Sequence, residues 1–199
     1  DSGGRIIEKL KELGLDEETV IIFTSDHGDW MGDHGLMQKA LLHYQGIIRV
    51  PFIWADPEDK NPGTVSTELA CSQDIPNSIL ARAGLAPCAG MQGKDLTKLL
   101  FGGEFTPHDG ILIQQQTTIP LPGDNQHMRV KTFADKEWRI SYYSGKDWGE
   151  LYNIKEDPGE IYNLWSSSEH QSIRLELMKR MFETMVDGES QSPLQVNVG

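Results

Sequence analysis

Acidic and imidazole side chains gather directly after a run of strand-forming residues near the start of the chain. The apolar residues 20–23 lead into Asp26, His27 and Gly28. Carboxylate oxygens and neutral imidazole nitrogens both bind divalent cations, and loops after the carboxyl ends of strands are the usual ligand sites in α/β sheets. Gly28 permits the backbone break that lets two neighbouring side chains reach one ion. We therefore predict that Asp26 and His27 bind a metal; the alternative is that Asp26 caps a helix and His27 lies on the surface.

Further polar side chains follow this pair in the same segment. Most lysines are solvated surface charges, but Lys39 stands a short loop away from the pair and could bind an anionic oxygen there. Asp29, Asp33 and His34 could add ligands, although they are also ordinary turn residues. The spacing differs from a calcium-binding EF-hand, which would need an acid or Asn at Gly28. None of these side chains is an obvious nucleophile.

The segments around the cluster alternate between helical and strand patterns. Residues 3–13 show the helical period, and the continuous apolar run at residues 20–23 is typical of a strand buried on both faces of a parallel sheet. A second buried strand is predicted within residues 50–57 and a helix within residues 69–84. Because a helix and a buried strand open the chain, we expect the middle of an α/β domain whose other strands lie outside it.

From residue 111 onward the pattern changes to short strands separated by turn residues. This pattern predicts an antiparallel meander within residues 106–165. Residues 170–186 have the period of an amphipathic helix. We expect this helix to pack on one face of the meander and to bury Leu177 and Met181.

Composition and charge exclude several classes of function. The net charge of −12 and the pI near 4.8 repel nucleic acid and anionic membranes. No apolar run reaches the ~18 residues of a membrane-spanning helix, and no signal peptide is visible, so localisation remains open. Cys71 and Cys88 favour two buried free thiols, although a disulfide between them is not excluded by their spacing.

Two long motifs carry a resemblance to a known family. Residues 24–54 contain T-S-D-H-G, then G-D-H-G, a Lys, a Tyr and R-V-P before an apolar strand. This order resembles the signature in the second half of sulfatases of the alkaline-phosphatase superfamily. Residues 150–165, ELYNIKEDPGEIYNLW, resemble that family's E-L-Y-D-L-x-x-D-P-x-E-x-x-N-L segment.

The resemblance implies a role for each matching residue. Asp26 and His27 match two metal ligands, and Lys39 matches the catalytic lysine that contacts the sulfate. Calcium is the usual metal of the family, and the imidazole ligand makes manganese or zinc an alternative. Supporting roles fall to His34, Tyr44 and Arg49.

The resemblance also implies a fold and a domain division. Residues 1–105 correspond to the C-terminal part of an alkaline-phosphatase-like α/β sulfatase domain. Residues 106–199 correspond to a small α+β subdomain with an antiparallel sheet and a C-terminal helix.

Two elements of the family pattern, including the nucleophile, are missing from this chain. Sulfatases carry an early Asp-Asp pair and a C/S-x-P/A-x-R motif, whose Cys or Ser is oxidised to formylglycine. Neither occurs here, because Cys71 and Cys88 each begin a different pattern. We therefore expect this chain to be a fragment whose partner is a missing N-terminal half. We expect the fragment to be inactive alone and to self-associate through an uncovered sheet.

We predict a sulfatase-family hydrolase of sulfate monoesters, represented by its C-terminal part. Phosphonate and phosphate monoester hydrolases share the Asp-His and Lys pattern and remain an alternative. A non-catalytic binding module with a vestigial metal motif is a second alternative. The sequence does not name the substrate, whose specificity loops we expect in the missing half and in residues 114–127.

Overall fold

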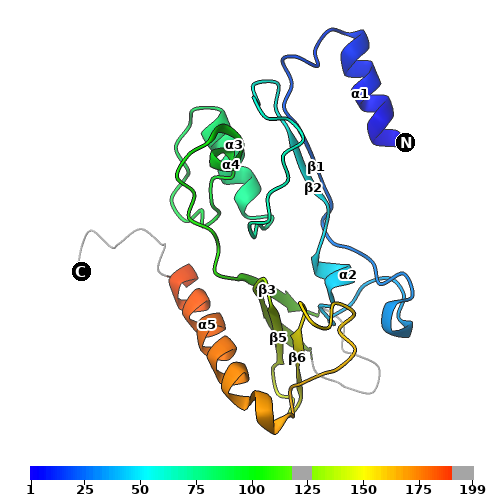
Figure 1. The fold of residues 1–199 in the computed structure, drawn as a ribbon, viewed down its shortest axis with the longest axis vertical. Helices are drawn as coiled ribbons and strands as arrows, with labels where there is room; N and C mark the ends of the chain where they lie inside the picture. The colour runs from blue at the N-terminus through cyan, green and yellow to red at the C-terminus, as the bar shows by residue number, and fades with distance from the viewer. Residues whose placement is uncertain (118–126, 190–199) are drawn as a thin grey trace, which may run out of the picture.

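Two separate antiparallel sheets organise the chain (Figure 1). The computed structural model describes residues 1–117 and 127–189. The elements in chain order are α1 (Ser2–Glu12), β1 (Ile21–Thr24), η1 (Asp33–Gly35), α2 (Gln45–Ile48), β2 (Phe52–Ala55), α3 (Asp74–Arg82), α4 (Thr97–Phe101), β3 (Ile111–Gln116), β4 (Arg129–Ala134), β5 (Trp138–Tyr143), β6 (Gly149–Asn153), η2 (Ser168–His170) and α5 (Gln171–Glu189). Among the described residues, no helix has the length and apolar character needed to cross a membrane.

The first sheet consists of β1 and β2, which pair antiparallel with Ile21 opposite Ala55. The predicted parallel sheet with strands buried on both faces was therefore wrong. Phe23 is 52% exposed and Ile53 is 58% exposed, because within the described residues little packs on the faces of this sheet. An apolar run shows that a strand is suited to burial, but it does not specify which elements cover that strand. The exposed apolar strands agree with the predicted uncovered sheet, while self-association stays a prediction.

The helices of the first half do not share a hydrophobic core with this sheet. The amphipathic α1 ends at Glu12, as its period predicted, yet none of its residues is buried. The predicted helix within residues 69–84 is α3, which contacts α4. Arg82 of α3 pairs with Asp56 just after β2, with its Nε 2.6 Å from the carboxylate. One partly buried ion pair thus ties α3 to the end of the small sheet.

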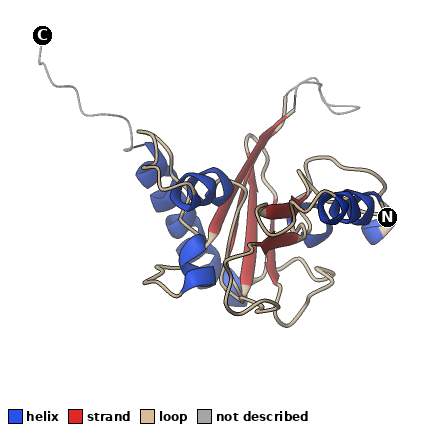
Figure 2. Cartoon of the chain, turned by 90° about the horizontal axis from the view of Figure 1, so that it is seen from above, coloured by secondary structure: helices blue, strands red, loops and turns tan. Residues whose placement is uncertain are grey.

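The second sheet is a four-stranded meander in the order β3-β4-β5-β6, with every neighbour antiparallel. The helix α5 runs along one face of it (Figures 1 and 2). Phe133, Ile140 and Leu151 stand on that face and pack against Leu177 and Met181 of the helix. Full burial of each such side chain contributes about 1.5–3 kcal/mol. The predicted meander, its covering helix and the burial of both helix residues are therefore confirmed.

The opposite face of the meander receives the segment that follows the predicted metal-binding pair. Leu41 packs there against Met128, Val130 and Tyr143. Tyr143 lies opposite Val130 in the β4–β5 register, so both side chains point to the same face. The meander therefore has a core on each side, one built with α5 and one built with the loop before α2. The boundary at residue 105 stays a prediction.

Candidate functional site

The predicted metal-binding pair lies in the loop directly after β1. Asp26 Oδ2 is 3.3 Å from His27 Nε2, so the two potential ligand atoms face the same point. The backbone N–H of His27 donates to the Asp26 carboxylate at 3.0 Å and lowers the pKa of Asp26. The carboxylate is thus ionised at neutral pH and open to solvent.

The hydrogen bonds of His27 fix which ring nitrogen can bind a cation. His27 Nδ1 lies 2.7 Å from the carbonyl oxygen of Gly28. A carbonyl oxygen accepts only, so Nδ1 carries a proton. The Lys39 ammonium group donates only and contacts Nε2, so the Nε2 lone pair points toward Lys39, beside the Asp26 carboxylate. A neutral imidazole held by a second hydrogen bond is the usual form of a metal-binding histidine.

Lys39 reaches the same point from the following loop. Its ammonium group contacts His27 Nε2, and its positive charge also lowers the pKa of Asp26. The three predicted catalytic and metal-binding side chains are therefore brought together. A positive charge thus contacts the His27 donor and acts on the nearby Asp26 carboxylate, so both donors accommodate positive charge. Two donor groups fill part of a calcium shell of about six to eight ligands, so the residues fit a divalent cation that takes further ligands from elsewhere.

Gly28 holds this loop against the short helix α2. Its backbone N–H donates to the carbonyl oxygen of Ile47 at 2.8 Å. A Cβ atom at Gly28 would overlap the carbonyl oxygen of Gly46. Gly28 thus permits a backbone approach that a residue with a Cβ atom would block. Through this contact, the position of α2 determines the position of His27.

The residues with predicted supporting roles lie around the same loop. The His34 ring stacks on Tyr44, with ring centroids 3.8 Å apart, and His34 has a left-handed φ of 53°. Tyr44 immediately precedes α2. Arg49 directly follows the same helix, and its backbone N–H donates to the carbonyl oxygen of Gln45. Asp29 accepts backbone N–H groups of Met31 and Gln38, so its carboxylate shapes the loop.

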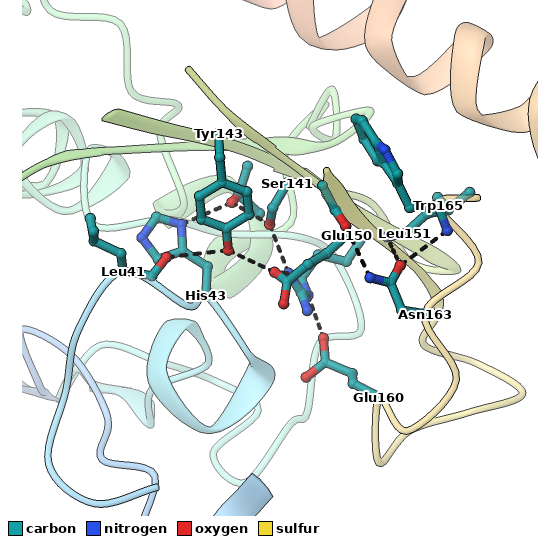
Figure 3. Close-up of polar contacts among 12 residues, drawn as sticks. Leu41, His43, Ser141, Tyr143, Glu150, Leu151, Glu160, Asn163 and Trp165 are labelled. Carbon is teal, nitrogen blue, oxygen red and sulfur yellow. Dashed lines mark hydrogen bonds and ion pairs between the residues drawn. The ribbon is translucent and has the colours of Figure 1, made fainter. Parts of the chain in front are cut away.

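A buried ion-pair network on the meander contacts the start of α2 (Figure 3). Glu160 accepts the backbone N–H of Gln45, the first residue of α2, at 2.7 Å. The same carboxylate pairs with Arg139, and Arg139 also pairs with Glu150 at 3.2 Å. Burial alone would lower the pKa of Arg139, but Glu150 and Glu160 outweigh it and raise the pKa. The Arg139 guanidinium also lies 5.2 Å over the Tyr44 ring.

Comparison with known proteins identifies the family of the chain. A sequence model described as "N-sulphoglucosamine sulphohydrolase, C-terminal" matches residues 32–187. The chain belongs to this sulfatase family. Its sequence is 30% identical over 106 residues to an N-acetylglucosamine-6-O-sulfatase of Bacteroides thetaiotaomicron, covering 53% of this chain and 19% of that protein. It is 35% identical over 100 residues to an arylsulfatase of Clostridium perfringens, covering 49% of this chain and 21% of that protein.

Solved structures show the same fold. A structure containing its substrate D-glucosamine-2-N,6-O-disulfate superposes with a TM-score of 0.83 at 24% identity, covering 98% of this chain and 39% of that chain. A phosphonate monoester hydrolase of Agrobacterium radiobacter superposes with a TM-score of 0.84 at 25% identity, covering 93% of this chain and 38% of that chain. The sulfatase chain therefore spans about two fifths of the structures it matches. Members of the superfamily generally use a divalent metal.

A second group of hydrogen-bonded polar side chains lies on the meander, and the sequence patterns did not predict it. His43 is buried between Thr132 Oγ1 at 2.9 Å and Gln115 Oε1 at 2.8 Å. Ser141 bonds Thr132 and accepts from Arg139, which joins this group to the ion-pair network. Burial lowers the pKa of His43 and keeps it neutral. The signal was weak: a histidine inside the apolar stretch around Leu41, and alternate polar residues on strands otherwise suited to burial.

Proposed function

We propose that this chain supplies the cation-binding and anion-contacting part of a hydrolase that cleaves sulfate monoesters. The observation that carries the proposal is the convergence of the Asp26 carboxylate, the His27 Nε2 lone pair and the Lys39 ammonium at one point. Two donors for a cation and an adjacent lysine suit an ester whose oxygens carry negative charge.

Each residue has a distinct task in this proposal. Asp26 and His27 hold a divalent cation, with calcium as the proposed ion and manganese or zinc as alternatives that suit the imidazole. Such a cation, when bound, would polarise the ester oxygen and help to activate a nucleophile. Lys39 contacts the transferred sulfuryl group and stabilises charge on its oxygens. Gly28 and α2 keep His27 in position.

The nucleophile and the remaining ligands are proposed to belong to another part of the whole enzyme. The chain contains no C/S-x-P/A-x-R motif, from which a formylglycine would form. The relatives with sulfatase names are several times longer than their aligned parts, which leaves room for that motif. Turnover by this chain alone is therefore not expected.

Phosphonate or phosphate monoester hydrolysis is the alternative within enzymes. The match to a phosphonate monoester hydrolase at a TM-score of 0.84 favours keeping it. Both reactions need a cation and a lysine beside an anionic tetrahedral group, so these residues alone do not separate them. Rates on an aryl sulfate and on an aryl phosphonate, measured with the whole enzyme, discriminate the two.

Two measurements test the proposal. Calcium titration followed by calorimetry is expected to show weak binding to this chain, lost in Asp26→Ala and retained in Asp59→Ala, an acid outside the cluster. Equal binding by both variants contradicts the proposed ligands. The second measurement incubates the chain with a chromogenic aryl sulfate and Ca²⁺ or Mn²⁺, and no turnover is expected. Metal-dependent turnover abolished by Asp26→Ala would show that this chain holds its own nucleophile.

A further inference from the structure

A second group of metal-ligating side chains lies at the start of α3, away from the loop after β1. Cys71, Asp74 and His108 each offer one ligand atom, and these atoms all lie within 4.8 Å of one another. The Asp74 side chain is fully buried and the His108 side chain is 16% exposed. The sulfatase resemblance assigned no role to any of the three.

The backbone holds the Asp74 carboxylate in one orientation. The N–H of Cys71 donates to Oδ2 at 2.8 Å, and the N–H of Lys94 donates to Oδ1 at 2.7 Å. Burial alone would raise the pKa of Asp74, but the bonds from His108 and from these two N–H groups outweigh it and lower the pKa. Gly93 presses against Gln73, where a Cβ would overlap the carbonyl oxygen. The carboxylate is therefore ionised and fixed before any ligand arrives.

The spacing of the donor atoms suits a tetrahedral cation. His108 Nε2 lies 3.0 Å from Asp74 Oδ1 and 3.1 Å from Oδ2. Two ligands that each stand ~2 Å from a tetrahedral zinc ion are ~3.3 Å apart, so a small shift admits the ion. Two residues separate Cys71 from Asp74, the spacing at which the first ligand pair of many zinc sites occurs. Sulfur, nitrogen and oxygen together favour zinc over calcium or magnesium.

An acidic hollow opens beside His108. It has a volume of about 500 Å³ and also contains one lysine, Lys136. Its carboxylates come from Glu68, Asp109, Asp135 and Glu137. Glu68 pairs with Lys136, and Asp135 pairs with Arg180. The attraction for cations therefore comes mainly from Asp109 and Glu137. A cation and a water molecule can therefore reach the His108 side of the group from solvent.

We propose that Cys71, Asp74 and His108 bind a thiophilic divalent cation of the zinc class, with water from the hollow as a fourth ligand. On binding, the Cys71 S–H bond breaks, the sulfur forms its bond to the cation, and the proton passes to solvent. The His108 proton moves from Nε2 to Nδ1, so that the Nε2 lone pair faces the cation. The proposal does not depend on the proposed sulfatase function.

The surroundings of Cys71 argue against a nucleophilic role for the same thiol. Burial raises the pKa of Cys71 to about 11, and the negative Asp74 adds to this effect. Nucleophilic cysteines need the opposite, a lowered pKa beside a positive group. Cys88 is exposed and provides a matched control within the chain.

Cobalt(II) is the probe for the first test, because a bound thiolate gives it a near-ultraviolet charge-transfer absorption. The whole chain is expected to develop this absorption with one equivalent of Co²⁺ and to lose it when Zn²⁺ is added. Cys71→Ser and His108→Ala abolish it. Cys88→Ser and Asp26→Ala retain it, which separates this group from the loop after β1. An absorption that is absent, or that follows Cys88, overturns the proposal.

Thiol alkylation gives a second test on the unaltered chain, in case a variant fails to fold. Zn²⁺ is expected to slow alkylation of Cys71 at least ~10-fold and to leave Cys88 unchanged, with the two sites resolved by peptide mass spectrometry. Equal modification of Cys71 with and without Zn²⁺ shows that Asp74 only organises the loop through hydrogen bonds.

Discussion

The two sheets of this chain reach very different degrees of burial, although the strands of the smaller sheet are the more apolar. In β6 every residue is buried, whereas no residue of β1 or β2 is. The difference lies in what covers them, because α5 and the loop before α2 cover the two faces of the meander. Within the described residues nothing comparable covers the small sheet. The side chains that could do chemistry stand at the end of the less covered sheet.

The better packed sheet therefore supports the less packed one. Glu160 reaches from the loop after β6 to the first residue of α2, and α2 meets Gly28 beside His27. In the proposed function, the meander supplies the stability, and the loop after β1 supplies the side chains that we propose as metal ligands. Four experiments with substituted chains test this division, in order of decreasing expected effect.

Two phenylalanines provide the largest contrast between the sheets. Phe133→Ala removes a ring that is 1% exposed in the meander core, so it is expected to lower the free energy of unfolding by about 3–5 kcal/mol. Phe23→Ala, at a side chain that is mostly exposed, should change it by less than about 0.5 kcal/mol. Urea denaturation of both variants measures the difference. Equal losses would mean that the small sheet is covered in solution, as self-association would cause.

The ion-pair network gives the second prediction. Glu160→Ala leaves buried Arg139 with one carboxylate partner and removes the acceptor of the Gln45 N–H, so it should cost roughly 3 kcal/mol in the free energy of unfolding. Glu156→Ala, at an exposed acid in the same loop, serves as the control. The chemical shifts of His27 in an NMR spectrum should move in the Glu160 variant. Unchanged His27 chemical shifts would contradict the idea that the ion-pair network positions the loop that carries His27.

Lys39 tests whether the less covered region carries function without stability. In the whole enzyme, Lys39→Ala is expected to lower turnover of an aryl sulfate by about 10²-fold or more, the effect of losing one stabiliser of anionic charge. Its free energy of unfolding should stay within about 0.5 kcal/mol of the parent. Lys60→Ala is the matched surface control. Turnover at the parental rate in the Lys39 variant rules out the sulfate contact.

The pair between Asp56 and Arg82 gives the smallest expected effect and a pH dependence. Hydrogen bonds from Arg82 lower the pKa of Asp56 below its ordinary value of 3.8. In acid the unfolded state therefore binds the proton more readily, so this stabilisation is complete above pH 3.8 and is lost as the pH falls through the folded pKa. Asp56→Asn should cost about 1–2 kcal/mol at pH 7, and the gap to the parent should narrow below pH 4. A gap that stays constant with pH would assign the loss to packing.

Local pattern predicted most of the elements but not how the first half is covered. The helical period gave α1 and α5, and closely spaced strands between turn residues gave the meander, because both patterns depend on near neighbours. The parallel sheet was wrong because burial of β1 depends on partners that no periodicity within β1 can specify. Cys71 is half-buried and Cys88 is exposed, so the expectation of two buried thiols held for neither in full.

The candidate site was predictable to a similar extent. Asp26, His27 and Lys39 were predicted from their chemical types and the motif that holds them; the structure brings the three side chains together, and their roles stay predictions. Arg139, Glu150 and Glu160 were not found, since each lies far along the sequence from the loop that it supports. Residues 118–126, which make up most of the expected specificity segment, lie outside the described residues. The roles of His34, Tyr44 and Arg49 stay predictions.

The bond between Gln45 and Glu160 joins residues 115 positions apart, and this separation has a kinetic consequence. Each meander strand pairs with its neighbour in sequence, so the sheet closes short loops at low entropic cost. The loop after β1 cannot take its final position until that sheet has presented Glu160 to α2. Refolding should therefore order the meander first and the loop after β1 last, and a ribosome must release the chain beyond Glu160 before this loop can take its final position.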